Sequence, residues 1–216
     1  AASAAVHDLG WRYLLGTFRC YVAVPSTAAA LEVAGTALAA CGAECDARLA
    51  VDIRADRVEL GLADPGTGQV TARDAELARG ITAALDERGY RTTAVADEGP
   101  RGVQLLEIAV DALDIPAVRP FWKAVLAYED EPGGDGVVDP LRQGPAVWFQ
   151  QMDAPRPQRN RIHFDLTVPH DEAQARVQAA LDAGGVLVSD AAARSFWIVA
   201  DREGNEVCVC TWQDRD

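Results

Sequence analysis

The second half of the chain carries one order of predicted elements twice, and this repeat limits the available folds more than any other feature. Each copy contains a strand and a helix followed by further strands. The first copy has strands at 103–111, 137–138 and 146–152 and a helix at 116–126. The second has strands at 160–168, 186–189, 195–200 and 206–212 and a helix ending at Leu181. The first copy shows one strand fewer than the second, but the shared order predicts an α+β domain built from two βαβββ units.

Apolar and polar residues alternate through the segment Asn160–Val168, which predicts a strand with one face on a core. The core-facing side chains are Ile162, Phe164, Leu166 and Val168. The opposite face carries a cation, an imidazole and a carboxylate in a row: Arg161, His163 and Asp165. We expect this polar row to form the floor of a cavity.

The first half follows a different order, β-β-α-β-β-α. The predicted strands lie at 11–15, 17–24, 48–54 and 57–63, and the predicted helices at 27–41 and 72–88. Ser26 and Thr71 stand where N-caps are expected, and Gly42 ends the first helix. The segment Ala94–Gly102 has the composition of a linker. The sequence thus predicts two domains, at residues 1–96 and 102–216.

Composition narrows the classes of partner. The net charge of -13 argues against nucleic acid and anionic membranes, because both are polyanions. The five cysteines show no disulfide framework, which favours free thiols in a reducing cytoplasm. The abundance of Ala, Arg and Asp with few Lys suggests a bacterial source. No run of about 20 apolar residues and no signal peptide is expected.

Three motifs in the second half resemble the vicinal-oxygen-chelate superfamily, which has the glyoxalase and bleomycin-resistance fold. The motifs are Asp114-x6-Phe121-Trp122-x3-Leu126, Asn160-Arg161-Ile162-His163-Phe164-Asp165 and Asp201-x2-Gly204-Asn205. The resemblance implies a cavity between the two repeats, with metal-ligand positions on each repeat's first and last strands. These positions fall on Glu107, Gln150, His163 and Cys208. Such a mixed donor set suits a hard metal ion poorly, so a pocket without metal is favoured.

The first half resembles pterin-4a-carbinolamine dehydratases. The resemblance rests on Trp11, on Arg57-Val58-x-Leu60, and on Val70-Thr71-x-x-Asp74-x-x-Leu77-Ala78. The histidines that such enzymes use would fall at positions 47 and 48 and at position 65, where this chain has Ala47, Arg48 and Pro65. We therefore expect an inactive dehydratase-like domain. Relatives of this kind dimerise, which makes a homodimer an expectation.

Three functional hypotheses remain open. The first is a lyase or isomerase that acts on a small organic molecule, with Glu107 and His163 transferring protons. The residues expected to bind its substrate, which suit a planar or aromatic compound, are Trp148, Gln150, Arg161, Asp165 and Trp197. The second hypothesis is a ligand-sequestering protein without turnover. The third is a metal-dependent dioxygenase or lyase.

Overall fold

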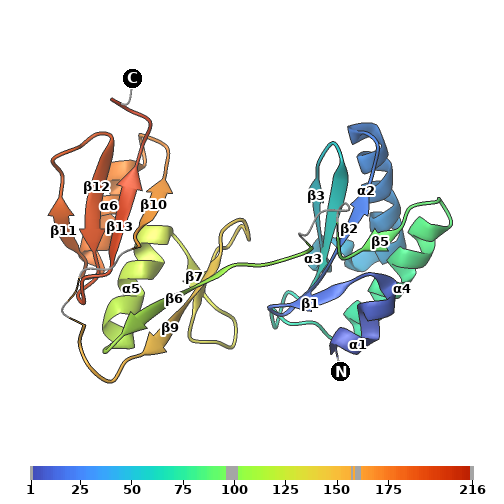
Figure 1. Cartoon of the computed structure of the whole chain (residues 1–216), viewed down its shortest axis with the longest axis horizontal. Coiled ribbons are helices and arrows are strands. Elements are labelled where there is room, and N and C mark those ends of the chain that lie inside the picture. Colours follow the sequence, from blue (N-terminus) through green and yellow to red (C-terminus); the bar gives the residue numbers. More distant parts are fainter. Residues whose placement is uncertain (1, 96–101, 157, 159–161, 215–216) are drawn as a thin grey trace. The chain divides into compact units, whose positions relative to one another are not determined.

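The computed structural model describes residues 2–95, 102–156, 158 and 162–214. The chain divides into two compact units, Ala1–Leu105 and Leu106–Asp216 (Figure 1). The division falls a few residues after the linker that the sequence predicts. Most of that linker, residues 96–101, lies outside the described part of the chain. Each unit has its own hydrophobic core, so each is described by itself.

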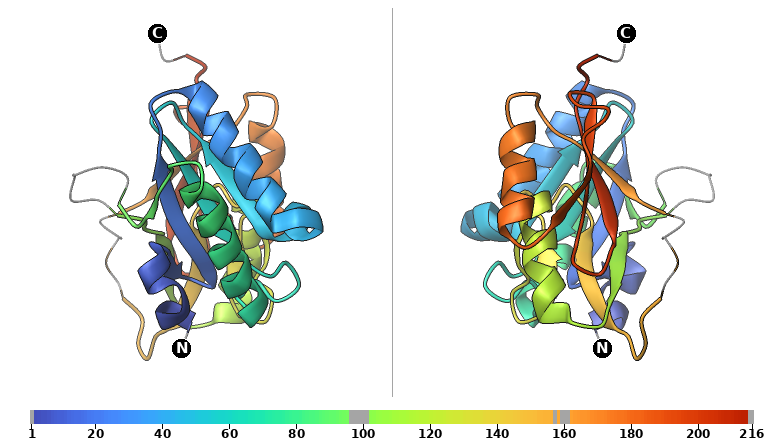
Figure 2. Two further views of the ribbon diagram at one scale, coloured as in Figure 1. Left: turned by 90° about the vertical axis from the view of Figure 1, so that its right-hand side faces the viewer. Right: turned by 90° about the vertical axis from the view of Figure 1, so that its left-hand side faces the viewer.

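The first unit is an antiparallel sheet with helices packed against it. Its helical elements are α1 (Ala2–Val6), η1 (His7–Leu9), α2 (Thr27–Cys41), η2 (Gly42–Glu44), α3 (Cys45–Arg48) and α4 (Ala72–Asp86). Its strands are β1 (Arg12–Leu14), β2 (Thr17–Ala23), β3 (Leu49–Ile53), β4 (Arg57–Leu62) and β5 (Thr92–Thr93). The strands are ordered β1-β2-β4-β3, and β5 pairs with β2. Helices α2 and α4 lie side by side over the sheet (Figure 2).

Local signals explain the two long helices. The side chain of Ser26 accepts a hydrogen bond from the amide of Ala29 at 3.2 Å, which begins α2 as predicted. A capping box between Thr71 and Asp74 begins α4. This helix ends at Asp86, two residues before the predicted end, and Gly89 follows it in a left-handed conformation.

The run Thr27–Arg48 requires a correction to the sequence analysis. Within its 22 residues, an 18-residue stretch has a mean hydropathy of 1.3, so by length and composition alone the run is apolar enough to cross a membrane. In the first unit one face of α2 packs into the core, through Ala30, Val33, Ala37 and Cys41. The run is also broken by the η2 turn. These features are those of a helix that covers a sheet.

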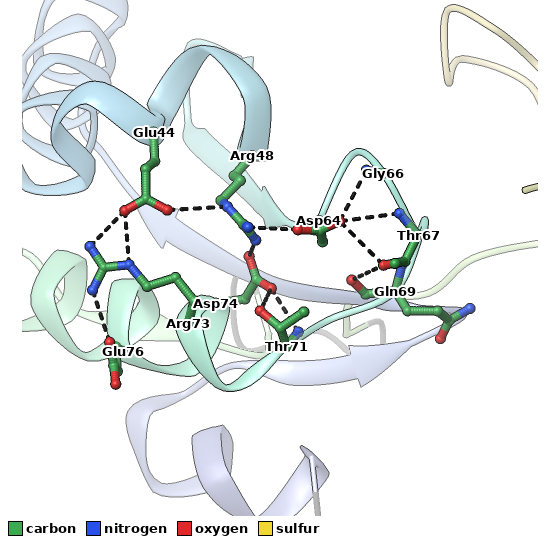
Figure 3. Close-up of polar contacts among 10 residues, drawn as sticks. All are labelled: Glu44, Arg48, Asp64, Gly66, Thr67, Gln69, Thr71, Arg73, Asp74 and Glu76. Atoms are coloured by element: carbon green, nitrogen blue, oxygen red, sulfur yellow. Dashed lines mark hydrogen bonds and ion pairs between the residues drawn. The ribbon is translucent and has the colours of Figure 1, made fainter.

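An ion-pair cluster centred on Arg48 joins α3 to the start of α4 (Figure 3). Its guanidinium lies 2.9 Å from Asp74, 2.6 Å from Asp64 and 3.3 Å from Glu44. The side chain of Asp74 is fully buried and also accepts hydrogen bonds from the amide and hydroxyl of Thr71. The hydrogen bond to Asp74 is the main reason that the pKa of Arg48 is raised. Arg48, which stands where the dehydratase resemblance would require a histidine, is therefore a structural cation.

The second unit contains the predicted repeat. The first copy comprises β6 (Glu107–Ala112), α5 (Ile115–Leu126), β7 (Glu129–Asp130), β8 (Val137–Val138) and β9 (Ala146–Gln151). The second comprises β10 (Phe164–Thr167), α6 (Ala173–Asp182), β11 (Val186–Ser189), β12 (Phe196–Ala200) and β13 (Glu206–Cys210). The two sheets have equivalent orders, β6-β9-β8-β7 and β10-β13-β12-β11, and the first and last strands of each copy are parallel neighbours.

One core serves both copies, and a turn from the second copy binds the first. Helices α5 and α6 are in contact, and the buried cluster takes residues from both sheets. Asp201, in the turn between β12 and β13, accepts a hydrogen bond from the indole of Trp122 in α5 at 3.0 Å. The carboxylate of Glu203 accepts hydrogen bonds from the amides of Leu113 and Asp114, just before α5. We call this turn, residues 201–205, the clasp.

Three strand predictions differ from the structure at their ends. The strand predicted at 103–111 begins only at Glu107. Within the segment Asn160–Val168, the described strand is only Phe164–Thr167. Ile162 was predicted to face the core, but its side chain is 74% exposed. Asn160 and Arg161 lie outside the described residues. The last strand ends at Cys210 instead of at Trp212, which is 79% exposed.

Candidate functional site

A pocket of about 510 Å³ lies on the face of the second sheet that is turned away from the core. It is lined by His163, Asp165, Ser195, Phe196, Ile198, Cys208 and Cys210. Its volume falls within the usual range for small-molecule sites. The lining combines polar groups on β10 and β13 with apolar side chains on β12. This composition is typical of a site that orients one reactive part of a small organic ligand.

Strand register explains why these residues meet. Asp165 on β10 stands beside Cys208 on β13, which stands beside Ile198 on β12. One step along, Cys210 stands beside Phe196. Side chains at paired positions of neighbouring strands project from the same face of a sheet. The strands therefore present two adjacent rows of side chains to the pocket.

His163 and Asp165 form the charged part of the lining. Nε2 of His163 lies 3.5 Å from Oδ1 of Asp165, although same-face residues on one strand are spaced about 7 Å apart. The imidazole closes this gap because His163 precedes the first paired residue of β10 and is not held by the sheet. Both side chains are more than half exposed, at 51% and 63%, so a ligand in the pocket can reach them.

Cys208 differs from them in being buried. Burial is the main cause that raises the pKa of its thiol to about 12, and a hydrogen bond to Asp165 and the charge of that carboxylate add to the effect. At neutral pH the thiol therefore keeps its proton and donates a hydrogen bond to the carboxylate of Asp165. The carboxylate thus lies between an imidazole and a thiol.

The same three residues form a group that could hold a metal ion. The ligand atoms of His163, Asp165 and Cys208 all lie within 4.8 Å of one another. Two of the four predicted metal-ligand residues, His163 and Cys208, are therefore together. The other two, Glu107 and Gln150, are not in this group, and Asp165 supplies the third ligand atom instead.

The remaining predicted site residues of the first repeat share one face of its sheet. Register places Glu107 beside Ala146, Ala109 beside Trp148, and Asp111 beside Gln150. Glu107, Trp148 and Gln150 are exposed, and none of them lines the described pocket. Glu107 is exposed because β6 turns this face of the sheet away from the core.

The structure places Trp197, a predicted substrate-binding residue, on the core side of β12. Its neighbour in register is Val209, a fully buried core residue, and Trp197 itself packs against that core. The residues that do line the pocket from β12 are its neighbours in sequence, Phe196 and Ile198. Arg161, the other cation expected near the site, lies outside the described residues.

Sequence reasoning missed four lining residues: Ser195, Phe196, Ile198 and Cys210. The alternation of β13 could have found Cys210, because it lies two residues after Cys208 on the same face. For β12 the apolar run Phe196–Ala200 carries no alternation that shows which side faces the core. Only the pairing of Phe196 with Cys210 decides it.

Comparison with known proteins finds a family similarity in the second unit. Residues 107–210 match the family model of the glyoxalase-like domain. The match lies within the second unit and covers slightly less than half of the chain. No curated protein sequence matches the chain.

Three solved structures illustrate the similarity. A hypothetical protein, SA1046, from S. aureus is 17% identical, with a TM-score of 0.38 over 50% of this chain and 94% of that chain. The fosfomycin resistance protein FosX from Mesorhizobium loti is 8% identical, with a TM-score of 0.40 over 50% and 90%. A glyoxalase/bleomycin resistance protein/dioxygenase family enzyme from Burkholderia phytofirmans is 13% identical, with a TM-score of 0.39 over 50% and 98%.

Proposed function

We propose that the glyoxalase-like domain is a small-molecule enzyme of the lyase or isomerase type, which transfers a proton at a carbon next to a carbonyl group. One observation carries the proposal: an exposed imidazole, His163, lies 3.5 Å from the carboxylate of Asp165 in a pocket of ligand size. Histidine is the side chain best suited to accept and return protons near neutral pH.

The neighbours of His163 support this role. When the imidazole accepts a proton from the substrate, the carboxylate of Asp165 stabilises the resulting positive charge. The carboxylate also orients the ring, because it fixes which nitrogen points at it. Phe196 and Ile198 on β12 supply the apolar wall against which the unreactive part of a substrate can pack. The thiol of Cys208 stays protonated at neutral pH, so it is not proposed as a nucleophile.

Proton exchange tests the proposal without knowledge of the product. We expect the protein in D₂O to replace the carbon-bound hydrogen next to the carbonyl in at least one member of a panel of α-hydroxyketones, β,γ-unsaturated ketones and 2-oxo acids. The loss of the corresponding proton resonance measures the rate against buffer alone. Compounds that raise the melting temperature of the protein but exchange no faster than in buffer would instead support sequestration without turnover.

A second candidate function is binding of a divalent metal in the same pocket, favoured by the grouping of His163, Asp165 and Cys208. Imidazole, carboxylate and thiolate are all zinc ligands, and ligand atoms around tetrahedral zinc lie roughly 3.3–3.8 Å apart. The 3.5 Å between His163 and Asp165 already matches such an edge. Three protein ligands would leave one position for water or substrate, as in catalytic zinc sites.

Metal retention tests this candidate. After incubation with zinc chloride and desalting, we expect about one zinc ion per chain by elemental analysis, and a clear loss in Cys208→Ser. Cys45→Ser is the matched control, because Cys45 is a partly exposed thiol of the first unit. Since zinc must displace the proton of Cys208, whose pKa is raised to about 12, affinity should increase as the pH rises. Equal zinc content in Cys208→Ser and wild type would exclude this ligand set.

A further inference from the structure

The outer strand of the second repeat presents an unprotected apolar edge. Strand β11 ends the sheet order β10-β13-β12-β11, and among the described strands it pairs only with β12 (Figure 1). Val186, Leu187 and Val188 are 55%, 40% and 49% exposed. Three consecutive large apolar residues thus face solvent beside the unpaired edge of a strand. Such edges readily accept another strand.

The equivalent strand of the first repeat provides an internal comparison. Strand β7 also ends its sheet, but it consists of Glu129 and Asp130, both exposed. Asp130 is held there by Lys123 at 2.6 Å and by Arg119 at 2.7 Å. Short length and charge are the devices by which proteins protect a sheet edge. Strand β11 contains neither a charged residue nor a proline, and its one irregularity lies between Leu187 and Ser189.

We propose that β11 is a self-association edge, across which β11 of a second copy of this chain adds in antiparallel orientation. A two-fold axis between Leu187 and Val188 would place Leu187 of each copy opposite Val188 of the other copy. The pairing is then the same for both copies, as a closed dimer requires. The uncharged strand lets two copies meet despite the net charge of -13.

Charges at the two ends of β11 complement this arrangement. In the proposed register Gly184 stands opposite residue 191 of the partner, next to the partner's Asp190. The guanidinium of Arg202 lies against Gly184, since a Cβ built there would be 2.9 Å from Nε. Both Arg202 and Asp190 are exposed. The two-fold axis therefore brings Arg202 of each copy towards Asp190 of the other, forming the same ion pair twice.

Sedimentation velocity of the full chain tests the proposal. We expect the wild type to sediment as a dimer, and Val188→Lys to raise the dissociation constant by about tenfold or more, because the buried ammonium would have no partner. Glu129→Lys, which changes the charge at the equivalent edge of the first repeat, should leave the dimer intact. The circular dichroism spectrum of each variant checks that it keeps the wild-type secondary structure.

A charge exchange provides a second, independent measurement. Arg202→Glu and Asp190→Arg should each weaken the dimer several-fold, and the double variant should restore it, because the pair is remade with the charges reversed. A monomeric wild type would overturn the proposal. So would a dimer that survives Val188→Lys but is broken by Leu31→Glu on the exposed face of α2, because the first unit would then provide the interface.

Discussion

Replacement of His163 by glutamine is expected to slow deuterium exchange into a responsive carbonyl substrate by about 100-fold or more. Glutamine keeps a polar group within reach of Asp165 but cannot take up a proton. The substitution should not destabilise the fold, because the side chain is half exposed and precedes β10. The exchange rate and the melting temperature of the variant together check the prediction.

His170→Gln is the matched control, because His170 is an exposed histidine outside the pocket lining. Its exchange rate should equal that of the wild type. The exchange rate of Asp165→Asn should lie between those of His163→Gln and His170→Gln. This substitution removes the negative charge that stabilises the protonated ring of His163. If His163→Gln exchanged within a few-fold of wild type, the base would have to be another group. Glu107, whose part in proton transfer stays a prediction, would then be tested by Glu107→Gln.

The substitution Asp201→Ala, which removes the carboxylate at the centre of the clasp, is expected to lower the free energy of unfolding of the second unit by about 3 kcal/mol. Asp201 is 2% exposed, and it accepts hydrogen bonds from Trp122, from Asn205 and from the amide of Glu203. The alanine variant would leave the buried indole N–H of Trp122 without an acceptor. Both the attachment to α5 and the turn itself would be weakened.

Tryptophan fluorescence can follow this loss, because every tryptophan except Trp11 lies in the second unit. A fall in the melting temperature of about 10 °C or more is expected for Asp201→Ala. Asp171→Ala, which removes an exposed carboxylate at the start of the second repeat's helix, should melt within a degree or two of wild type. Equal melting of the two variants would show that the clasp contributes little to joining the repeats.

The elements that the sequence predicted well are those with both a hydrophobic pattern and end signals. Helix α5 has Asp114 as its N-cap, and its buried residues recur at helical spacing: Val118, Phe121, Trp122 and Val125. The clasp was recognisable because its Asp and Gly belong to a tight turn with a left-handed residue, Gly204. These are local properties of the chain.

The candidate site was harder to predict because it depends on which strand lies beside which. The polar row of the second repeat identified His163 and Asp165, but their partner Cys208 is fixed by the parallel pairing of β10 with β13. The face on which Trp197 lies could not be predicted, because tryptophan suits both a pocket and a core. Phe196 and Ile198 face the pocket only because Trp197 pairs with a core valine.

The Arg48 cluster has a consequence for what the first unit could be made to do. A guanidinium stays protonated from acid to strong alkali. The hydrogen bond to Asp74 raises the pKa of Arg48 further. Arg48 can act as a counter-ion for three carboxylates, but it cannot relay a proton at any pH the protein meets. A redesign that places an imidazole at this position must therefore also remove Asp74 or neutralise it, because otherwise a buried negative charge would lose its permanent partner.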